Sequence, residues 1–595
     1  MTNMKGTWNI SRRALLKGAG AGAAVLGLAG CSSGSADGSA SGSSADATTA
    51  SITENEAEAV ACTSDQIGLS LEEMQSWAKD EVYDVDAQAA IAEELASQKD
   101  GQTLAQPLVA YNPFGTNSQS LYVYFTTEEA ATVEYTVSVS DEEAAGIEDE
   151  SFTAGSIADF TRSVNGGESA TEFEFSLYGL VPNVENTVTI TATYESGDVE
   201  TTTFVCDMCN VLGTEELQLD VTDGESDAGL EDGLYTVIGN TEPDSPVFTY
   251  FYDNDGILRG ELPLYSYRSD RLAFQDNLMY FCYSYSDLAA MNELGQVVKT
   301  YTLTKSSDDG TNYSMHHDYV FDDSGHLMVL ATDKEADTEE DLILFLNVET
   351  GEIDHVLDMG DLMGSYKEQA VAYNLENDED ASEDGHQVDW IHINTIQWAG
   401  DDSIILSCRE ISSIIKVSNI YDSPSIAYII SSKEYWEGTE YEDLVYEQVG
   451  DFTVQGGQHT VTYVEDDSLD EGQYYLYMYD NHIGTSAYTT SDFDYSVLGL
   501  SDHGWWTDEE GVYSYYYKYL VDENEGTFEL VSSIEVPYSG YVSSAQELEA
   551  NVIVCSGKVT SETAEFGVYD EDGDLIRSYT MGVTNWIYRV FKYDL

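Results

Sequence analysis

The spacing of hydrophobic positions changes along the chain. Between Leu69 and Gln98, Leu, Met and Trp recur at three- and four-residue spacings among acidic and alanine positions, which predicts helix. From Gln106 onward, β-branched and aromatic runs separated by turn residues predict strands. The clearest runs are Leu121–Phe125, Thr132–Val137 and Thr187–Ala192. We therefore expect a helical segment over residues 61–105 and an immunoglobulin-like β-sandwich over residues 106–215.

The longest part of the chain, residues 216–595, shows almost no helical periodicity. Short strand patterns alternate there with acidic Asp-Gly and Asp-Asp-Ser turns, and tyrosine is abundant. A stretch of this kind is typical of a six-bladed β-propeller with irregular blades, and nothing in it indicates the crossover helices of a parallel sheet. The predicted fold is therefore all-β, with a six-bladed β-propeller, an N-terminal immunoglobulin-like β-sandwich and a short helical segment before it.

A weak internal repeat places three polar residues at equivalent positions in the predicted propeller. His317, Asn394 and His459 each lie eight residues before the matching position of an acidic turn. Equivalent positions on the innermost strands of different blades converge near the axis of a propeller. The repeat therefore predicts that these three side chains point into one funnel.

The first residues predict export. Ser11-Arg12-Arg13 begins a twin-arginine (Tat) motif, and the Gly/Ala-rich stretch after it is too short to span a membrane. Leu28-Ala29-Gly30-Cys31 resembles a lipobox, so Cys31 is the expected lipidation site, with a plain Tat signal as the alternative. We expect residues 1–31 to be a signal peptide and residues 32–60, rich in Ser, Gly and Ala, to be a flexible tether. The predicted location is the outer face of the cytoplasmic membrane, reached through the lipid anchor alone.

Charge narrows the range of partners. The chain carries 111 Asp and Glu against 22 Lys and Arg, a formal net charge of -89. Such a surface repels nucleic acid and anionic lipid head groups, so neither is an expected partner. Among so few cations, an arginine that lies beside candidate catalytic residues gains weight.

Cysteines do not decide the function. Cys206 and Cys209 form the closely spaced pair, for which a disulfide, a redox pair and half a metal site are all open. We favour a structural role, because no second CxxC completes a zinc site.

Three segments of the predicted propeller concentrate residues suited to catalysis. They are Met315–Asp318, Asp389–Asn394 with Ser407–Arg409, and Gly457–His459. If residues 389–394 form a regular strand, Trp390, His392 and Asn394 share one face and the isoleucines between them pack away. In a regular strand His316 and His317 face opposite ways, and the repeat favours His317 toward the funnel. These segments hold four of the nine histidines, which indicates a site.

The segments together resemble the bacterial arylsulfate sulfotransferases, which use no nucleotide sulfate donor. The family's order of HHD, DWxHxN, SxR, QH and DN motifs is matched by His316-His317-Asp318, Asp389–Asn394, Ser407–Arg409, Gln458-His459 and Asp480-Asn481. Further family-like segments are Asn112–Gly115, Gly179–Asn183 and Tyr541–Gln546.

This resemblance implies a ping-pong transfer of a sulfuryl group from an aryl sulfate ester to a phenol, through a sulfohistidine at His459. It implies that sulfuryl binding and proton transfer belong to His317, His392, Asn394 and Arg409. Substrate contact or support of those residues is expected from His316, Asp318, Trp390 and Asn481. Cationic and amide donors suit the charge that spreads over the moving group. We expect no cofactor and no metal, small aryl sulfates and phenols as partners, and a homodimer as one open oligomeric state.

Two alternatives stay open. The histidines could hold iron, copper or zinc in a metal-dependent propeller enzyme, although Arg409 and Asn394 are poor metal ligands. The chain could instead be a non-catalytic surface lipoprotein with a Tyr-rich recognition platform. Two departures from the family pattern are Glu410, which could pair with Arg409 and weaken its hold on sulfate, and the acidic insert Glu376–Asp384, which could restrict the funnel.

Overall fold

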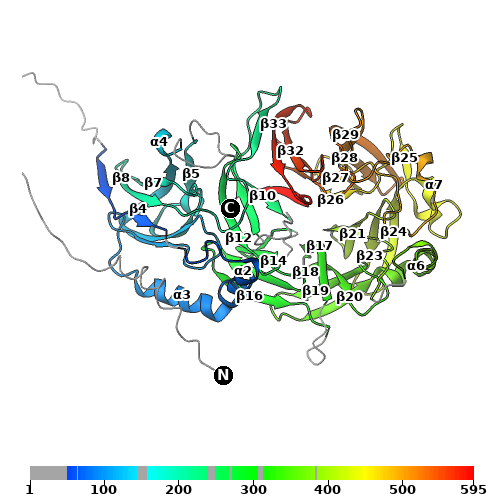
Figure 1. Cartoon of the computed structure of the whole chain (residues 1–595), viewed down its shortest axis with the longest axis horizontal. Coiled ribbons are helices and arrows are strands. Elements are labelled where there is room, and N and C mark those ends of the chain that lie inside the picture. Colours follow the sequence, from blue (N-terminus) through cyan, green and yellow to red (C-terminus); the bar gives the residue numbers. More distant parts are fainter. Residues whose placement is uncertain are drawn as a thin grey trace, which may run out of the picture.

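The computed structural model describes residues 50–62, 64–144, 157–238, 248–266, 271–305, 313–381 and 385–594. The predicted signal peptide, Cys31 and most of the predicted tether lie outside these residues. The described chain is mostly β, as predicted, with an N-terminal sandwich, a short helical segment and a six-bladed propeller (Figure 1). No described helix is both long and apolar enough to cross a membrane.

One long strand, β4 (Leu121–Ser138), joins the layers of the sandwich. Its first part pairs with β3 (Leu108–Tyr111) and β6 (Ala170–Leu177), and its second part with β5 (Phe160–Ser163) and β7 (Glu185–Tyr194). β8 (Val199–Asp207) pairs with β7, along which every second side chain is buried. This alternation places the core of the sandwich on one face of each strand. The short helix α4 (Asp141–Ala144) follows β4.

The chain before the helices also belongs to the sandwich. β1 (Ile52–Glu56) and β2 (Val60–Ala61) run parallel to β8, and a disulfide joins Cys62 to Cys209. Cys206 is a buried free thiol. The second cysteine of the CxxC pair is therefore structural, with a partner far away in the sequence.

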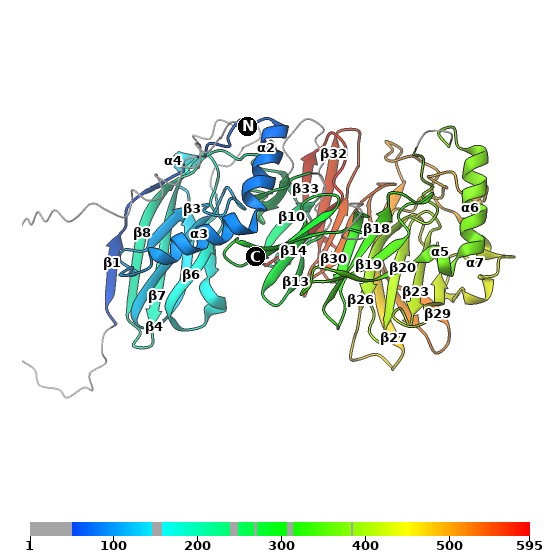
Figure 2. The same ribbon diagram turned by 90° about the horizontal axis from the view of Figure 1, so that it is seen from below.

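The helical segment lies between sandwich and propeller (Figure 2). α2 (Leu71–Trp77) begins at a capping box of Ser70 and Glu73, and α3 (Val85–Ser97) is capped by Asp84. Met74 packs into the propeller core. Gln88 is fully buried; its side chain donates to Phe114 O and accepts from Val297 N, so it links the two domains.

Six sheets of four or five strands form the propeller blades. The first blade consists of β34 (Arg589–Tyr593), β10 (Leu234–Ile238), β11 (Phe248–Tyr252) and β12 (Leu258–Pro263). The second consists of β13 (Ala273–Gln275), β14 (Leu278–Cys282), β15 (Asp287–Asn292) and β16 (Val297–Thr302). The third consists of β17 (Tyr313–Phe321), β18 (His326–Asp333), β19 (Leu342–Asn347) and β20 (Ile353–Asp358). The fourth blade consists of β21 (Ile393–Trp398), β22 (Ser403–Cys408), β23 (Ser413–Ser418) and β24 (Ser425–Ile430). The fifth consists of β26 (His459–Val464), β27 (Gln473–Asp480), β28 (Tyr513–Asp522), β29 (Thr527–Pro537) and β25 (Glu447–Val449). The sixth consists of β30 (Ser544–Glu547), β31 (Val552–Ser556), β32 (Thr563–Tyr569), β33 (Leu575–Gly582) and β9 (Asp220–Asp223).

The ring is closed twice. β34 pairs with β10 in the first blade, and β9 pairs with β33 in the sixth. The first strands of the blades, β13, β17, β21, β26, β30 and β34, contact one another in this order around the axis. A residue at the end of one of these strands therefore lies close to the corresponding residues of its neighbours.

Three described helices lie before and after the fourth blade. α5 (Met359–Leu362) and α6 (Gly364–Asn377) connect β20 to β21, and α7 (Lys433–Trp436) follows β24. The sequence pattern did not predict α6, because only Ala370 and Asn374 of its residues are buried and no apolar stripe marks it.

Candidate active site

The predicted site residues come from three consecutive blades. His316, His317 and Asp318 lie in β17, His392 directly precedes β21, Arg409 directly follows β22, and His459 begins β26. Their rings lie close together. The ring centroid of His317 is 4.7 Å from that of His392 and 5.4 Å from that of Tyr588, and the ring centroid of His459 is 6.2 Å from that of Tyr588. The structure therefore brings His317, His392, Arg409 and His459 to one end of the innermost strands.

β17 is not a regular strand at its histidines. The pairing register with β18 shifts between Met315 and Tyr319, and His317 has a φ of 58°. The imidazoles consequently meet, with 2.9 Å between the Nδ1 atoms of His316 and His317. The expectation that these rings face opposite ways depended on a regular strand, and the bulge removes that condition.

Residues 389–392 precede β21 and do not form the expected alternating strand. His392 has a φ of 50°, and Trp390 is fully buried in the core. The Trp390 indole donates to Asp341 Oδ2 at 2.8 Å. The predicted shared face of Trp390, His392 and Asn394 is therefore wrong, because strand alternation starts only at Ile393. Substrate contact by Trp390 is not supported by this position.

Two carboxylates hold His392. Its Nδ1 lies 2.7 Å from Glu340 Oε2 and also contacts Asp389 Oδ2. Burial by itself would lower the pKa of His392, but Glu340 and Asp389 raise it to about 10. Burial and the charge of Glu340 in turn raise the pKa of Asp389 to about 7, although His392 opposes this. At neutral pH His392 is thus an imidazolium.

His459, in contrast to His392, is a neutral imidazole. Its Nδ1 donates to Asn481 Oδ1 at 2.7 Å, and the Asn481 amide donates to the carbonyls of Ser539 and Val542. Burial and then the positive charge of Arg409 hold the pKa of His459 well below its ordinary value. With the proton on Nδ1, the Nε2 lone pair of a neutral imidazole is available, and Nε2 has no hydrogen-bond partner in the described part of the chain.

Arg409 is a cation without a counter-ion. Among the described residues its guanidinium forms no ion pair, and Nε is buried without a hydrogen-bond partner. It faces the rings of Tyr488 at 5.8 Å and Tyr541 at 5.6 Å. Glu410 does not pair with it; that carboxylate accepts hydrogen bonds from Ser486, Ala487, Tyr488 and Thr490. A buried guanidinium in this state is suited to an anionic ligand.

Aromatic side chains extend from Arg409 toward solvent. Tyr541 stacks on Trp505 at 4.5 Å, and both meet Trp586 edge-on. Trp505 is 51% exposed. The arginine therefore lies at the inner end of an aromatic wall.

Asn394 and Asp318 are fully buried behind the site. The Asn394 amide donates to Gln458 O at 2.8 Å and so supports the strand that carries His459. Asp318 pairs with Arg589 at 3.0 Å and Arg271 at 3.3 Å, and Arg589 also donates to Asn394 O. Direct contact of Asn394 or Asp318 with a substrate stays a prediction.

Sequence reasoning missed Glu340, Tyr488, Tyr588 and Arg589. None of them lies at the repeat position that His317, Asn394 and His459 share, so no periodicity marks them. The rarity of arginine in an acidic chain was the one available signal for Arg589.

The histidines and carboxylates also offer metal-ligand geometry. Within the described residues, His316, His317 and Glu340 place one ligand atom each within 4.8 Å of one another, as do Glu340, Asp389 and His392. These donor types suit a first-row divalent metal.

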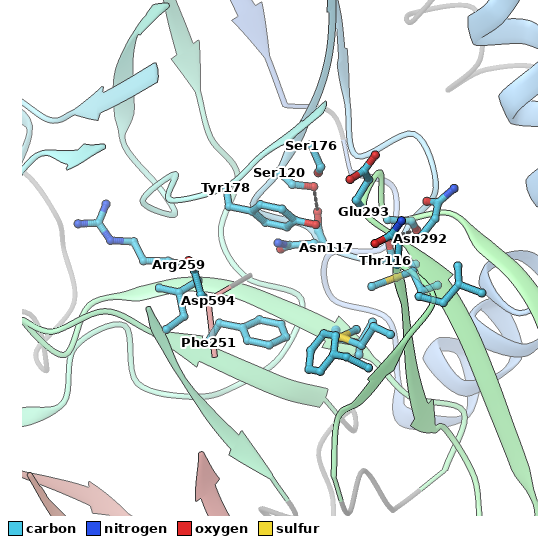
Figure 3. Close-up of a pocket in the computed structure, with 18 of the residues that line it drawn as sticks. Thr116, Asn117, Ser120, Ser176, Tyr178, Phe251, Arg259, Asn292, Glu293 and Asp594 are labelled. Atoms are coloured by element: carbon cyan, nitrogen blue, oxygen red, sulfur yellow. Dashed lines mark hydrogen bonds between the residues drawn. The ribbon is translucent and has the colours of Figure 1, made fainter. Parts of the chain in front are cut away.

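A cavity of about 510 Å³ lies elsewhere, between the sandwich and the first two blades (Figure 3). Tyr178, Phe251 and Met279 are among its lining residues, and none of the predicted site residues is. Arg259 lines it, but its guanidinium is already bound by Asp253 and two carbonyls. This cavity does not offer the chemistry of the histidine site.

Comparisons with known proteins cover both domains. The family model described as arylsulfotransferase (ASST) matches residues 221–589, more than half of the chain, and the arylsulfotransferase Ig-like domain matches residues 108–209. A search of curated proteins returns no match.

Similar solved structures include a candidate 6-phosphogluconolactonase from Bacteroides fragilis, at 10% identity and a TM-score of 0.33, covering 78% of this chain and 98% of that one. BamB from Moraxella catarrhalis is similar at 9% identity and a TM-score of 0.27, covering 62% of this chain and 99% of that one. Scores of this size carry no functional conclusion.

Proposed function

The chain belongs to the arylsulfotransferase family, and from this membership we propose that it transfers a sulfuryl group from an aryl sulfate ester to a phenol through a sulfohistidine at His459. The observation that carries the proposal is the pairing of a neutral, oriented imidazole at His459 with an uncompensated guanidinium at Arg409. The first supplies a nucleophile and the second a partner for a sulfate ester.

The first half-reaction then balances as follows. The Nε2 lone pair of His459 forms an N–S bond while the S–O(aryl) bond breaks and its electron pair leaves on the phenolate oxygen. Arg409 and the imidazolium of His392 stabilise the negative charge spread over the three sulfuryl oxygens. A proton passes from a neighbouring histidine to the phenolate, and the phenol leaves.

The second half-reaction reverses these steps with a new phenol. Its O–H proton passes to the histidine, its oxygen forms an S–O bond, and the N–S bond breaks to return the electron pair to Nε2. Tyr541 and Trp505, which adjoin Arg409, are placed to contact the aryl groups.

The test is an acceptor-dependent assay with 4-nitrophenyl sulfate and phenol. We expect His459→Ala to lower transfer by about 1,000-fold or more, since a nucleophile is lost. His503→Ala is the matched control, because His503 is partly exposed and faces Glu509. Intact-protein mass spectrometry after donor alone should show one added sulfuryl group on the wild type and none on the variant. Full transfer by His459→Ala would overturn the proposal.

A metal-dependent enzyme is the second candidate, favoured by the ligand geometry around Glu340. It predicts stoichiometric metal in the purified protein and activity that is lost with a chelator and restored with the metal. We expect neither.

We also propose export by the Tat pathway and lipidation at Cys31, as predicted from the first residues. Metabolic labelling with a fatty acid, lost on Cys31→Ala, tests this.

A further inference from the structure

Glu340 is held in place more firmly than an ordinary loop residue. It lies between β18 and β19 with a φ of 58°, a conformation that costs energy for a residue other than glycine. Its N–H donates to Thr332 Oγ1 at 2.9 Å, and its carbonyl accepts from Ile393 N at 3.3 Å. The third and fourth blades thus both fix its backbone.

The side chain of Glu340 reaches two of the site histidines. Its Oε2 lies 2.7 Å from His392 Nδ1 and 3.6 Å from His317 Nδ1. Nδ1 of His392 donates its hydrogen bond to Asp389 Oδ2, and Glu340 adds an ion-pair contact at the same nitrogen. Both carboxylates therefore hold the Nδ1 edge of the ring and leave Nε2, which has no hydrogen-bond partner among the described residues, for the substrate. A carboxylate placed in this way orients a catalytic imidazole without touching the substrate itself.

We infer that Glu340 is a positioning residue of the transfer: its carboxylate, fixed between two blades, acts together with Asp389 to orient His392 for proton exchange with the phenol. The inference rests on the proposed function and assigns its proton transfer to His392. It adds a residue that no motif in the sequence marked.

The charge state of His392 fits this role. The pKa of His392, raised to about 10 by the carboxylates against the effect of burial, is close to the reference value of about 10 for a phenol side chain. Proton exchange between groups of similar pKa is nearly balanced, so one residue can serve both half-reactions. The groups that surround His392 are Glu339, Glu340, Asp389, His317, Arg409, His459 and Tyr488, with Glu410 acting through Asp389.

The test compares two donors in the Glu340→Gln variant, which keeps the shape of the side chain and removes its charge. Phenolate is a stronger base than 4-nitrophenolate, so its departure depends more on a proton. We expect kcat with phenyl sulfate to fall by about 100-fold or more, and kcat with 4-nitrophenyl sulfate to fall far less. The alkaline limb of the pH profile should move to lower pH, because loss of the negative charge lowers the pKa of His392.

The controls separate the outcomes. Glu335→Gln removes a 65% exposed carboxylate from the same connection and should change neither donor. Glu340→Asp should restore part of the phenyl sulfate activity. Equal loss for both donors with an unmoved pH profile would show a merely structural role and overturn the inference. Stoichiometric metal lost with Glu340→Gln would overturn it in favour of a metal ligand. If the wild type forms no sulfohistidine, the proposed function fails instead.

Discussion

The two central imidazoles differ in charge: His459 is neutral and His392 is cationic. Both are buried, and ring contacts through His317 and Tyr588 connect them. His459 is bound to a neutral amide and lies near Arg409, which disfavours a second positive charge. His392 contacts two carboxylates, which favour a positive charge on its ring. A neutral nucleophile and a cationic proton donor can therefore coexist at one pH, as the proposed ping-pong transfer requires.

The charge state of His459 predicts an unusual pH dependence. An ordinary imidazole of pKa about 6.5 would keep only about a quarter of its neutral form at about pH 6. Because burial and Arg409 hold the pKa of His459 well below that value, sulfohistidine formation should show no loss from protonation of His459 between about pH 8 and about pH 6. Asp389, whose pKa is about 7, is the site carboxyl that titrates in this range, so the measurement is made on Asp389→Asn as well as on the wild type. Single-turnover release of 4-nitrophenol, quantified by chromatography, measures this. A decline centred near the ordinary histidine pKa in both proteins would contradict the assignment.

At the level of elements, the ends of the innermost strands are irregular where the chemistry lies. His317, His392 and Thr460 all have positive φ values, and the pairing of β17, β21 and β26 with the next strand shifts register beside them. Such bulges re-aim side chains that a regular strand would send to alternate faces. The internal repeat of the sequence predicts which strands carry the site, because equivalent positions of the repeat fall on equivalent strands of the blades.

The sequence could not predict the local aim of those side chains. Trp390 was assigned to the face of His392 by strand alternation, but alternation has no meaning before β21 begins. Glu340 reaches His392, and Arg589 reaches Asp318 and Asn394, across blade boundaries, and such contacts are set by tertiary packing. The sandwich was easier to predict, because its buried and exposed positions alternate along β7 over most of its length.

The pairing of β1 and β2 with β8 depends on one covalent link. The disulfide between Cys62 and Cys209 spans 147 residues, and a loop of that length corresponds to about 5 kcal/mol in the chain-entropy model. We expect the Cys62→Ser/Cys209→Ser double variant to lower the unfolding midpoint of the sandwich and to leave sulfuryl transfer unchanged, because neither cysteine lies near the histidines. Differential scanning calorimetry with and without reductant checks this. Reductant should have no further effect on the double variant.

Across the whole molecule, ring closure and the site share one ion cluster. Arg589 begins β34, the strand that closes the first blade, and pairs with Asp318 of the third blade inside the ring. Both side chains are fully buried. Removing Arg589 takes the closer of two cations from the buried Asp318 carboxylate and leaves it with Arg271 at 3.3 Å.

We therefore expect Arg589→Met to reduce the free energy of unfolding by about 3–5 kcal/mol, measured by urea denaturation. The Arg589→Met/Asp318→Leu double variant should recover much of that loss, because it also removes the buried carboxylate and leaves Arg271, whose side chain is partly exposed to water, as the remaining charge. Strictly additive losses would show that the pair is not coupled.

The position of Arg589 also bears on how the protein matures. Ribosomes make β34 after every other strand of the propeller, yet Asp318 and Asn394 in earlier blades need its guanidinium to complete their contacts. A nascent or truncated chain that lacks β34 would thus hold its histidines in an unfinished pocket. We therefore expect the proposed transfer to appear all at once, when the last strand docks, and a chain without β34 to be inactive.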